Sequence, residues 1–297
     1  MVAHQYYLGC PVWANKDWVS SFYTRRVKSA DYLRQYAKVF NSVEGSTTFY
    51  SLPSPEMVLR WKQETPNTFR FTFKFPRTIT HDYRLRNVRQ ETLQFFKAIE
   101  PLQARIGVLL LQLPPTFGYR QLPDLAAYLP LLPADYQYAV EVRHRDFFDL
   151  SENAHRLDNL LSESQIDRAV FDTSVLHNIN YTQDPLTIEA QRKKPKMPAY
   201  FTATAQHPFV RYIGHSTPAD NIERLKTIAR FVIQWIAEGR TPYVFMHTPG
   251  DLYAPQLCRL FHHLLAEMWP PDSKELWILP PFPAETEAEE AQQMSLF

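Results

Sequence analysis

Eight short apolar segments recur along the chain, and segments with helical periodicity separate them. Strands that alternate with helices run parallel, because each helix returns the chain to the same end of the sheet. The pattern therefore predicts an α/β fold, and eight repeats predict a single (β/α)8 barrel of the TIM type. The candidate strands are YYLG (6–9), VFNSVEG (39–45), FRFTFKF (69–75), GVLLLQL (107–113), YAVEVR (138–143), AVFDT (169–173), FVRYIG (209–214) and YVFMHT (243–248).

A doubly wound sheet is the alternative architecture for this pattern. It usually carries a glycine-rich first turn, and neither G-x-G-x-x-G nor G-x-x-x-x-G-K-S/T occurs in the sequence. The helical segments have ordinary boundary signals. Ser54 and Pro55 predict the start of one helix, and Gly239 predicts the end of another.

Length and composition set the expected domain organisation. The 297 residues are 45% hydrophobic, which suits a globular chain with a large core. We expect one barrel domain over residues 1–283 and a short, acidic, disordered tail over 284–297. No apolar run is long enough for a membrane span or a signal peptide, and Cys10 and Cys258 form no disulfide framework or zinc motif. We therefore expect a cytoplasmic protein that does not bind membranes.

Alternation within the strands predicts which side chains face the barrel axis, because successive side chains point to opposite faces. We expect the large apolar set of each strand to face the helices and the smaller, polar set to face the axis. Barrel enzymes place their sites at the carboxyl ends of the strands. The late polar residues there are Glu44, Lys74, Gln112, Glu141, Arg143, Asp172, Arg211 and His247. A salt-bridge network that only fills the barrel is the alternative, although burying many charges for stability alone is unfavourable.

Two long loops follow the third and sixth predicted strands and should lie at the same barrel mouth. Residues 76–89 contain His81 and four arginines, and residues 174–208 contain the basic segment QRKKPKMP, with Arg192, Lys193 and Lys194. Loops this long usually have a function. A basic rim above the polar residues would attract phosphate or another anion. A solvated run of charge is the alternative for the basic segment.

The net charge is unevenly distributed along the chain. The whole chain carries +1, and residues 284–297 contain four glutamates and no Lys or Arg. Without those four negative charges the remaining chain would carry +5. This charge is compatible with an anionic ligand but is far below that of an obligate nucleic-acid binder, and ordinary solubility explains it equally well.

Several segments resemble one known family. They are VEGSTTFYSLP (43–53), FRFTFKFPRTITH (69–81), LLLQLPPTF (109–117), YAVEVRH (138–144) and FDTS (171–174). These segments resemble the YecE-like proteins, also called domain of unknown function 72, and AQRKKPK, YVFMHT and the terminal SLF are similar to the bacterial YecE branch. The resemblance implies a TIM-type barrel and brings no established activity. Ser46 and His247 depart from the commoner family pattern, which has Asn at both positions.

The pattern and the resemblance together give a set of candidate site residues. The carboxylates, lysine and histidine with predicted catalytic roles are Glu44, Lys74, His81, Glu141 and Asp172. The predicted substrate-binding residues are Tyr50, Gln112, Arg143, His144, Arg192, Lys193, Lys194, Arg211 and His247. Their spacing matches no known metal motif, so the cofactor is unassigned and a divalent metal is one option.

The last five residues, QMSLF, form a separate motif. They resemble the short peptide with which bacterial replication and repair proteins bind the DNA sliding clamp, in which Gln enters a polar pocket and Leu and Phe fill an apolar cleft. The predicted partner-binding residues are Gln293, Met294, Ser295, Leu296 and Phe297. Docking of Leu296 and Phe297 on the barrel itself is the alternative.

Three functions remain open from the sequence. The favoured one is a clamp-recruited enzyme that hydrolyses phosphodiester or glycosidic bonds in nucleic acid. The second is an enzyme acting on a small phosphorylated or carboxylated substrate through the same residues. The third is a non-catalytic adaptor whose tail binds the clamp.

Overall fold

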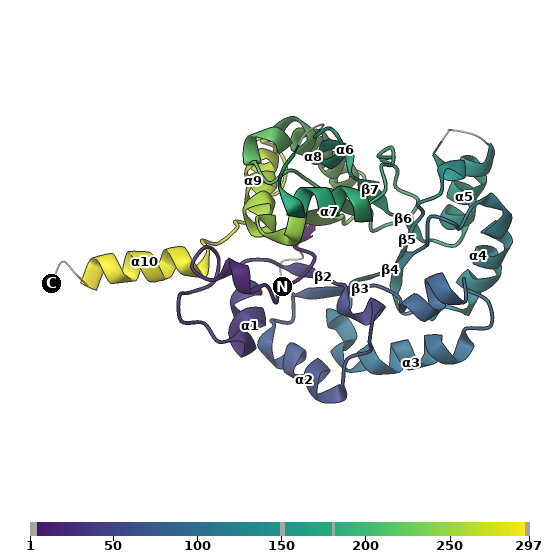
Figure 1. The fold of residues 1–297 in the computed structure, drawn as a ribbon, viewed down its shortest axis with the longest axis horizontal. Coiled ribbons are helices and arrows are strands. Elements are labelled where there is room, and N and C mark those ends of the chain that lie inside the picture. Colours follow the sequence, from purple (N-terminus) through teal and green to yellow (C-terminus); the bar gives the residue numbers. More distant parts are fainter. Residues whose placement is uncertain (1–4, 149–151, 180–181, 295–297) are drawn as a thin grey trace.

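The computed structural model describes residues 5–148, 152–179 and 182–294. It has an α/β fold in which parallel strands lie at the centre and helices surround them (Figure 1). Each of the eight predicted strands has a counterpart at its expected position. The strands are β1 Tyr7–Gly9, β2 Ser42–Gly45, β3 Arg70–Phe73, β4 Val108–Gln112, β5 Gln137–Glu141, β6 Asp167–Arg168, β7 Val170–Asp172, β8 Phe209–Ile213 and β9 Tyr243–His247.

The strands form three parallel sheets within the described residues. Their orders are β1-β9-β8-β7, β2-β3 and β4-β5-β6. Backbone hydrogen bonds also join separate sheets: the Glu44 N–H donates to the Cys10 carbonyl at 3.0 Å, and the Phe75 N–H donates to the Leu110 carbonyl at 3.0 Å. The predicted parallel α/β fold is confirmed. One closed eight-stranded sheet is not found in the described part of the chain, so the predicted closed barrel is not confirmed.

The helices begin and end largely where local signals place them. They are α1 Tyr32–Tyr36, α2 Pro55–Glu64, α3 Arg89–Ile99, α4 Leu122–Tyr128, α5 Glu152–Glu163, α6 Ser174–His177, α7 Pro185–Lys193, α8 Ile222–Ala237, α9 Ala254–Glu267 and α10 Pro283–Met294. Ser54 caps α2 by accepting the Met57 N–H, and Gly239 follows α8 with φ of 80°, a conformation that glycine adopts without strain. None of the helices in these ranges has the length and apolar character needed to cross a bilayer.

Two apolar clusters lie on opposite faces of the strands, whereas the alternation predicts smaller and polar residues on the inner face. On the helix side, the four phenylalanines of residues 69–75 pack in the main core. On the inner side, a smaller cluster contains Val108, Leu110, Ala139, Ala169, Phe209, Tyr243 and Phe245. The inner cluster fills the space between the strands toward their amino ends. The next inward-facing positions along the strands are polar, and these form the candidate site.

The acidic tail differs from the prediction over residues 284–294, because these residues belong to α10, which projects from the body of the molecule (Figure 1). The helix has an anchored start. Phe282 is buried against Phe22, and Glu285 accepts hydrogen bonds from both Arg259 guanidinium nitrogens at 2.6 and 2.8 Å and from the Phe282 N–H at 2.8 Å. The Ala-, Glu- and Gln-rich sequence then favours helix. Ser295, Leu296 and Phe297 lie outside the described residues.

Candidate functional site

Inward-facing polar side chains from several strands meet at the carboxyl ends of the sheets. On β8, Phe209 joins the inner apolar cluster, so Arg211 two residues later points to the same side. On β9, Phe245 and His247 are related in the same way. The site is therefore a polar layer placed directly on the inner apolar cluster.

Glu44 lies at the centre of this layer and is fully buried. Its Oε1 accepts from Lys74 Nζ at 2.7 Å and Arg211 Nη2 at 3.0 Å, and its Oε2 accepts from Arg211 Nε at 2.7 Å. Burial alone would raise the pKa of Glu44, but Arg211, Lys74 and His247 outweigh it and hold that pKa well below its usual range. Ser46 Oγ and His247 Nε2, the two departures from the family pattern, also contact Glu44, at 3.2 and 3.3 Å.

Glu141 forms the second buried carboxylate of the site. Its Oε2 accepts from Arg211 Nη1 at 2.5 Å and its Oε1 from Arg143 Nε at 2.6 Å. Burial opposes the charged carboxylate, yet Arg143 and Arg211 lower the pKa of Glu141. Arg143 Nη2 also donates to Gln112 Oε1 at 3.1 Å, and its guanidinium lies over the Phe171 ring, 4.4 Å from the centroid. These contacts hold Arg143 in one orientation.

The hydrogen bonds distinguish one cation whose nitrogens all donate to carboxylates from two cations that keep N–H groups able to bind a ligand. Arg211 uses Nε and both terminal nitrogens on the two carboxylates, so it is a structural link. Lys74 and Arg143 retain N–H groups that no described residue accepts, and their side chains are 11% and 13% exposed. Three cations face two carboxylates, so the layer carries a net positive charge and has donors available at its surface.

His81 lies at the edge of the layer on η4 (Thr78–Asp82), a short π-helical turn after β3. Its Nδ1 is 2.8 Å from Thr80 Oγ1, and its ring meets Phe49 edge to face. Burial, followed by the charges of Arg143 and Arg77, lowers the pKa of His81 to about 4. The imidazole is therefore neutral near pH 7, with a free lone pair, and is a weak base.

His247 is a second neutral histidine but lies deeper in the site. Burial lowers its pKa to about 4 although Glu44 opposes the shift. Its Nδ1 is 3.7 Å from Asp251 Oδ1, too far for a hydrogen bond. Asp251 belongs to the turn η10 (Pro249–Asp251) after β9 and was not singled out from the sequence. Its position four residues after His247 at the end of a strand was the available signal.

Asp172 does not face this layer, which corrects its expected position. Its Oδ2 accepts from Arg224 Nε on α8 at 2.5 Å, and its Oδ1 accepts the Ser174 N–H at 3.0 Å. Phe171 occupies the inner face of β7 beneath Arg143 and Arg211. Adjacent strand residues point to opposite faces, so Asp172 must point toward the helices.

The remaining predicted residues lie around the mouth at different depths. Tyr50 is 80% exposed, and Arg192 and Lys193 are exposed on α7. His144 accepts the Asp146 N–H through Nδ1 at 3.3 Å and so caps a turn. Lys194 alone of the basic segment QRKKPKMP interacts with the charges of the buried layer. The structure thus separates the basic segment into exposed residues and one inward-facing lysine.

The donor set does not form an evident metal centre. In the described ranges, no group of three or more His, Cys, Asp and Glu side chains is arranged to hold an ion. The oxygens of Glu44 and Glu141 already accept from Lys74, Arg143 and Arg211. A metal ligand role for these carboxylates would require displacement of the cations, so we assign no chemical step to a metal.

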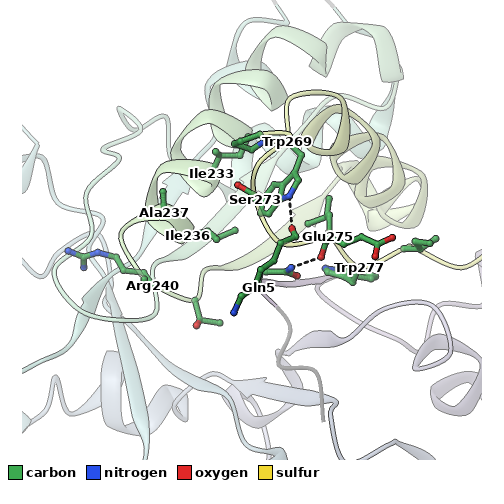
Figure 2. A pocket seen from close by; sticks show the side chains of 15 residues that line it. Gln5, Ile233, Ile236, Ala237, Arg240, Trp269, Ser273, Glu275 and Trp277 are labelled. Carbon is green, nitrogen blue, oxygen red and sulfur yellow. Dashed lines mark hydrogen bonds between the residues drawn. The ribbon is translucent and has the colours of Figure 1, made fainter.

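A separate groove of about 1000 Å³ lies at the amino ends of the strands. Figure 2 shows Gln5, the end of α8 and the loop of residues 269–278 around it, with Gln5 Nε2 donating to the Glu275 carbonyl at 2.7 Å. Its walls are mostly apolar, including Ile233, Ile236 and Trp269. None of the predicted site residues lines this groove, and the ion-pair layer lies at the opposite ends of the strands.

Fold and site define an α/β protein with parallel strands and a buried, net positive ion-pair layer at their carboxyl ends. The chain belongs to the family described as Protein of unknown function DUF72, whose model matches residues 7–276. The UPF0759 protein YecE of Escherichia coli (strain K12) is 38% identical over 291 residues, covering 98% of this chain and 99% of the relative. The UPF0759 protein YunF of Bacillus subtilis (strain 168) is 28% identical over 151 residues, covering 48% and 52%.

Solved structures show the same fold. A DUF72 family protein from Thermotoga maritima MSB8 superposes with a TM-score of 0.67 at 23% identity and covers 88% of this chain and 99% of that chain. One from Enterococcus faecalis V583 superposes with a TM-score of 0.65 at 16% identity and covers 93% and 98%. The likeness concerns the fold, and the family description assigns no activity.

Proposed function

We propose that this chain is an enzyme that acts on a small phosphorylated or carboxylated substrate at the carboxyl ends of its strands. The observation that carries the proposal is the pair of partly exposed cations, Lys74 and Arg143, fixed on a floor of buried carboxylates. Fixed donors in a partly buried site bind an anion more strongly than solvated ones. The neutral His81 at the edge of this layer supplies a proton acceptor.

We also infer that the three sheets form the wall of a TIM-type barrel. Backbone hydrogen bonds connect the end of β1 to β2, the end of β3 to β4, and β5 to Ala169 just before β7. These connections follow the order in which strands are arranged around such a barrel. The inner apolar cluster and the polar layer then correspond to successive layers of a barrel interior. This arrangement puts the loops of residues 76–89 and 174–208 at one mouth.

We propose different roles for the predicted catalytic residues on the basis of their contacts. Glu44 and Glu141 hold the cations in place, because both oxygens of each carboxylate already accept hydrogen bonds from cationic side chains. Lys74 and Arg143 bind the anionic group of the substrate. His81 transfers the proton. Gln112 orients Arg143 through its Oε1.

The depth of the cations favours a small substrate over a nucleic-acid chain. Lys74 and Arg143 are only 11% and 13% exposed, whereas a polymer backbone is usually held by a row of exposed basic side chains. A terminal phosphate or a carboxylate can enter such a site alone. Nucleic-acid hydrolysis, the function favoured from the sequence, therefore becomes the second choice for this layer.

The test is the binding of inorganic phosphate and of simple carboxylates to the full chain, measured by calorimetry and by the shift in melting temperature. We expect at least one of these anions to raise the melting temperature, because a ligand that binds the folded state stabilises it. Arg143→Ala should abolish the shift, and Arg145→Ala, at an exposed arginine two residues away, should preserve it. Absence of any shift, or an equal shift in Arg143→Ala, would overturn the proposal.

A second proposal concerns recruitment and rests on α10. We propose that the C-terminal peptide, containing Gln293, Met294, Ser295, Leu296 and Phe297, binds a bacterial sliding clamp. In support, α10 projects from the body and its residues 288–293 are exposed, so the helix forms an arm between the body and the peptide (Figure 1). Binding of the full chain to a purified bacterial clamp should be lost in Leu296→Ala/Phe297→Ala. If the intact chain does not bind the clamp, this proposal is wrong and the first is unaffected.

A further inference from the structure

Lys194 differs from the basic residues next to it. Lys193, at the end of α7, is 64% exposed and pairs with Glu189 Oε1 at 2.5 Å, and Arg192 is also exposed. The Lys194 side chain is instead partly buried, and its amine makes no hydrogen bond or ion pair with any described residue. A sheltered amine without such a partner is unusual, because burial penalises an ammonium group that has no counter-charge in contact.

The backbone around Lys194 is held on both sides. Its N–H donates to the Ala190 carbonyl at 2.9 Å, and its carbonyl lies 2.8 Å from His177 Nε2 on α6. Helix α7 in turn packs on η10, because the Leu186 side chain approaches Gly250 so closely that a Cβ there would lie 3.0 Å from Leu186 Cδ1. The lysine is therefore positioned by α6 and α7 above the carboxyl end of β9.

The charges that act on Lys194 place its amine at the polar layer. They belong to Asp251, Arg211, Lys74 and Glu44. The pKa of Lys194 is lowered to about 8, mainly by burial. Arg211 and Lys74 contribute to the lowering, and Asp251 and Glu44 oppose it. Near pH 7 about a tenth of such amines are neutral, roughly two hundred times the fraction for an ordinary solvated lysine.

Asp251 supplies a second polar atom without a hydrogen-bond partner. Its Oδ1 is buried and accepts no hydrogen bond from any described residue. The residue has φ of 55°, a left-handed conformation that is uncommon outside glycine, and its carbonyl accepts from Trp18 Nε1 at 2.9 Å. The charge of this carboxylate acts on the Lys194 amine.

We propose that Lys194 is a reactive amine that forms a Schiff base with the carbonyl carbon of a small anionic substrate, such as a 2-oxo acid or a phosphorylated aldehyde. This inference rests on the proposed function and adds the class of substrate and a covalent step. Lys74 and Arg143 bind the carboxylate or phosphate, which leaves the carbonyl group to meet Lys194 from the loop above.

The reaction balances with the amine, the carbonyl compound and solvent. The ammonium group first releases a proton to solvent. The neutral amine attacks the carbonyl carbon, a C–N bond forms as the C=O π bond opens, and the oxygen takes up that proton to give a carbinolamine protonated on nitrogen. The nitrogen then passes a proton through solvent to the hydroxyl group, and water leaves as the C=N bond forms. The net change is loss of one water from the protonated amine and the carbonyl compound, without oxidant or reductant.

The experiment traps the adduct on the full-length protein. The chain is incubated with glyoxylate, a 2-oxo acid, and sodium cyanoborohydride near pH 7, and the labelled lysines are mapped by peptide mass spectrometry. We expect Lys194 to be labelled at least tens of times faster than exposed lysines such as Lys193. Lys193→Ala should keep the label at position 194, and Lys194→Arg should remove it. Equal labelling of Lys194 and exposed lysines would overturn the inference. This comparison uses only the wild-type chain, so it does not depend on whether the variants fold.

Added inorganic phosphate separates this inference from the proposed function. Protection of Lys194 by phosphate in the wild type, but not in Arg143→Ala, supports both. A phosphate-induced rise in melting temperature without preferential labelling of Lys194 keeps the anion site and overturns the reactive amine. Preferential labelling that neither phosphate nor a simple carboxylate such as acetate slows keeps the amine and overturns the anion site.

Discussion

Arg211 and Glu44, 167 residues apart in the chain, form a two-contact ion pair in the interior of the protein, with Nε–Oε2 and Nη2–Oε1 distances of 2.7 and 3.0 Å. Neither side chain has appreciable contact with solvent. The same guanidinium also binds Glu141, so one arginine neutralises parts of two carboxylates. Burial of these charges costs folding free energy, and their mutual attraction offsets that cost only while every member of the network is present.

Removing Arg211 should therefore destabilise the fold strongly. In Arg211→Met, Glu44 and Glu141 lose their shared counter-charge while still buried, and breaking a buried pair typically costs about 3–5 kcal/mol. Urea denaturation would measure this loss in the free energy of unfolding. Arg230→Met, at an exposed arginine on α8, is the matched control and should leave the midpoint nearly unchanged. Equal midpoints for the two variants would contradict the structural role of Arg211.

His247 should make stability depend on pH between about 4 and 6.5. Its pKa in the folded protein is about 4, below the ordinary value near 6.5 expected in the unfolded chain. The unfolded chain therefore binds more protons in this window, so the stability contributed by the neutral histidine is complete above pH 6.5 and is lost as the pH falls toward 4. The contribution has an upper limit of roughly 3 kcal/mol.

Denaturation of His247→Asn across that pH range would test this dependence. The variant should show a flatter profile than the wild type, and Glu44 and Glu141 should not obscure the difference because their lowered pKa values act at more acidic pH. His263→Asn, at a histidine whose side chain is 70% exposed, should keep the wild-type slope. A parallel profile for His247→Asn and wild type would show that the histidine is not buried in its neutral form.

The strands and most of the polar layer were predictable because both follow from local, period-two alternation. Large apolar residues at alternate positions identify the helix-facing side, so the polar set must face inward. Asp172 was misplaced because Val170 and Phe171 are both apolar, which leaves the phase of this short strand undetermined. The phase is set by pairing with β8, where Phe171 is in register with Arg211.

Other features depended on contacts that no local pattern contains. The start of α10 is held by Arg259 and Phe22, distant in sequence from Glu285 and Phe282. Lys194 cannot be distinguished from Lys193 in a run of basic residues, and only the packing of α6 and α7 directs it inward. Closure of a barrel depends on hydrogen bonds at every sheet edge, and alternation of strands and helices does not specify those bonds.

His81 should titrate far below an ordinary histidine. Its pKa of about 4 has burial as the main cause, followed by the charges of Arg143 and Arg77, so Arg143→Ala should raise it. The ring-proton chemical shift of His81, followed by NMR against pH, would measure the midpoint. Arg145→Ala is the control and should leave it unchanged. A midpoint near 6.5 would show that burial and the neighbouring cations do not act on His81 in this way. With a midpoint near 4, activity that needs the neutral imidazole should fall only as the pH approaches 4.

Asp172→Asn should reduce stability without affecting anion binding. The substitution weakens the contacts to Arg224 Nε and the Ser174 N–H, a loss of about 1–3 kcal/mol for hydrogen bonds to a charged group. Phosphate affinity should stay within about twofold, because the side chain points away from Lys74 and Arg143. Denaturation and phosphate titration of the same preparation would measure both. Lost binding with unchanged stability would instead make Asp172 a site residue.

Glu285 should control the attachment of α10 to the body. Glu285→Ala removes the paired contacts to Arg259 and the acceptor for the Phe282 N–H, which together start the helix. An exposed ion pair of this kind contributes about 0.5–1 kcal/mol, so amide hydrogen exchange at the start of α10 should be roughly two- to fivefold faster. Glu289→Ala, at an exposed glutamate on the same helix, controls for the higher helix propensity of alanine. Exchange as slow in Glu285→Ala as in Glu289→Ala would show that α10 does not depend on this contact, and its starting anchor would then be the buried Phe282 alone.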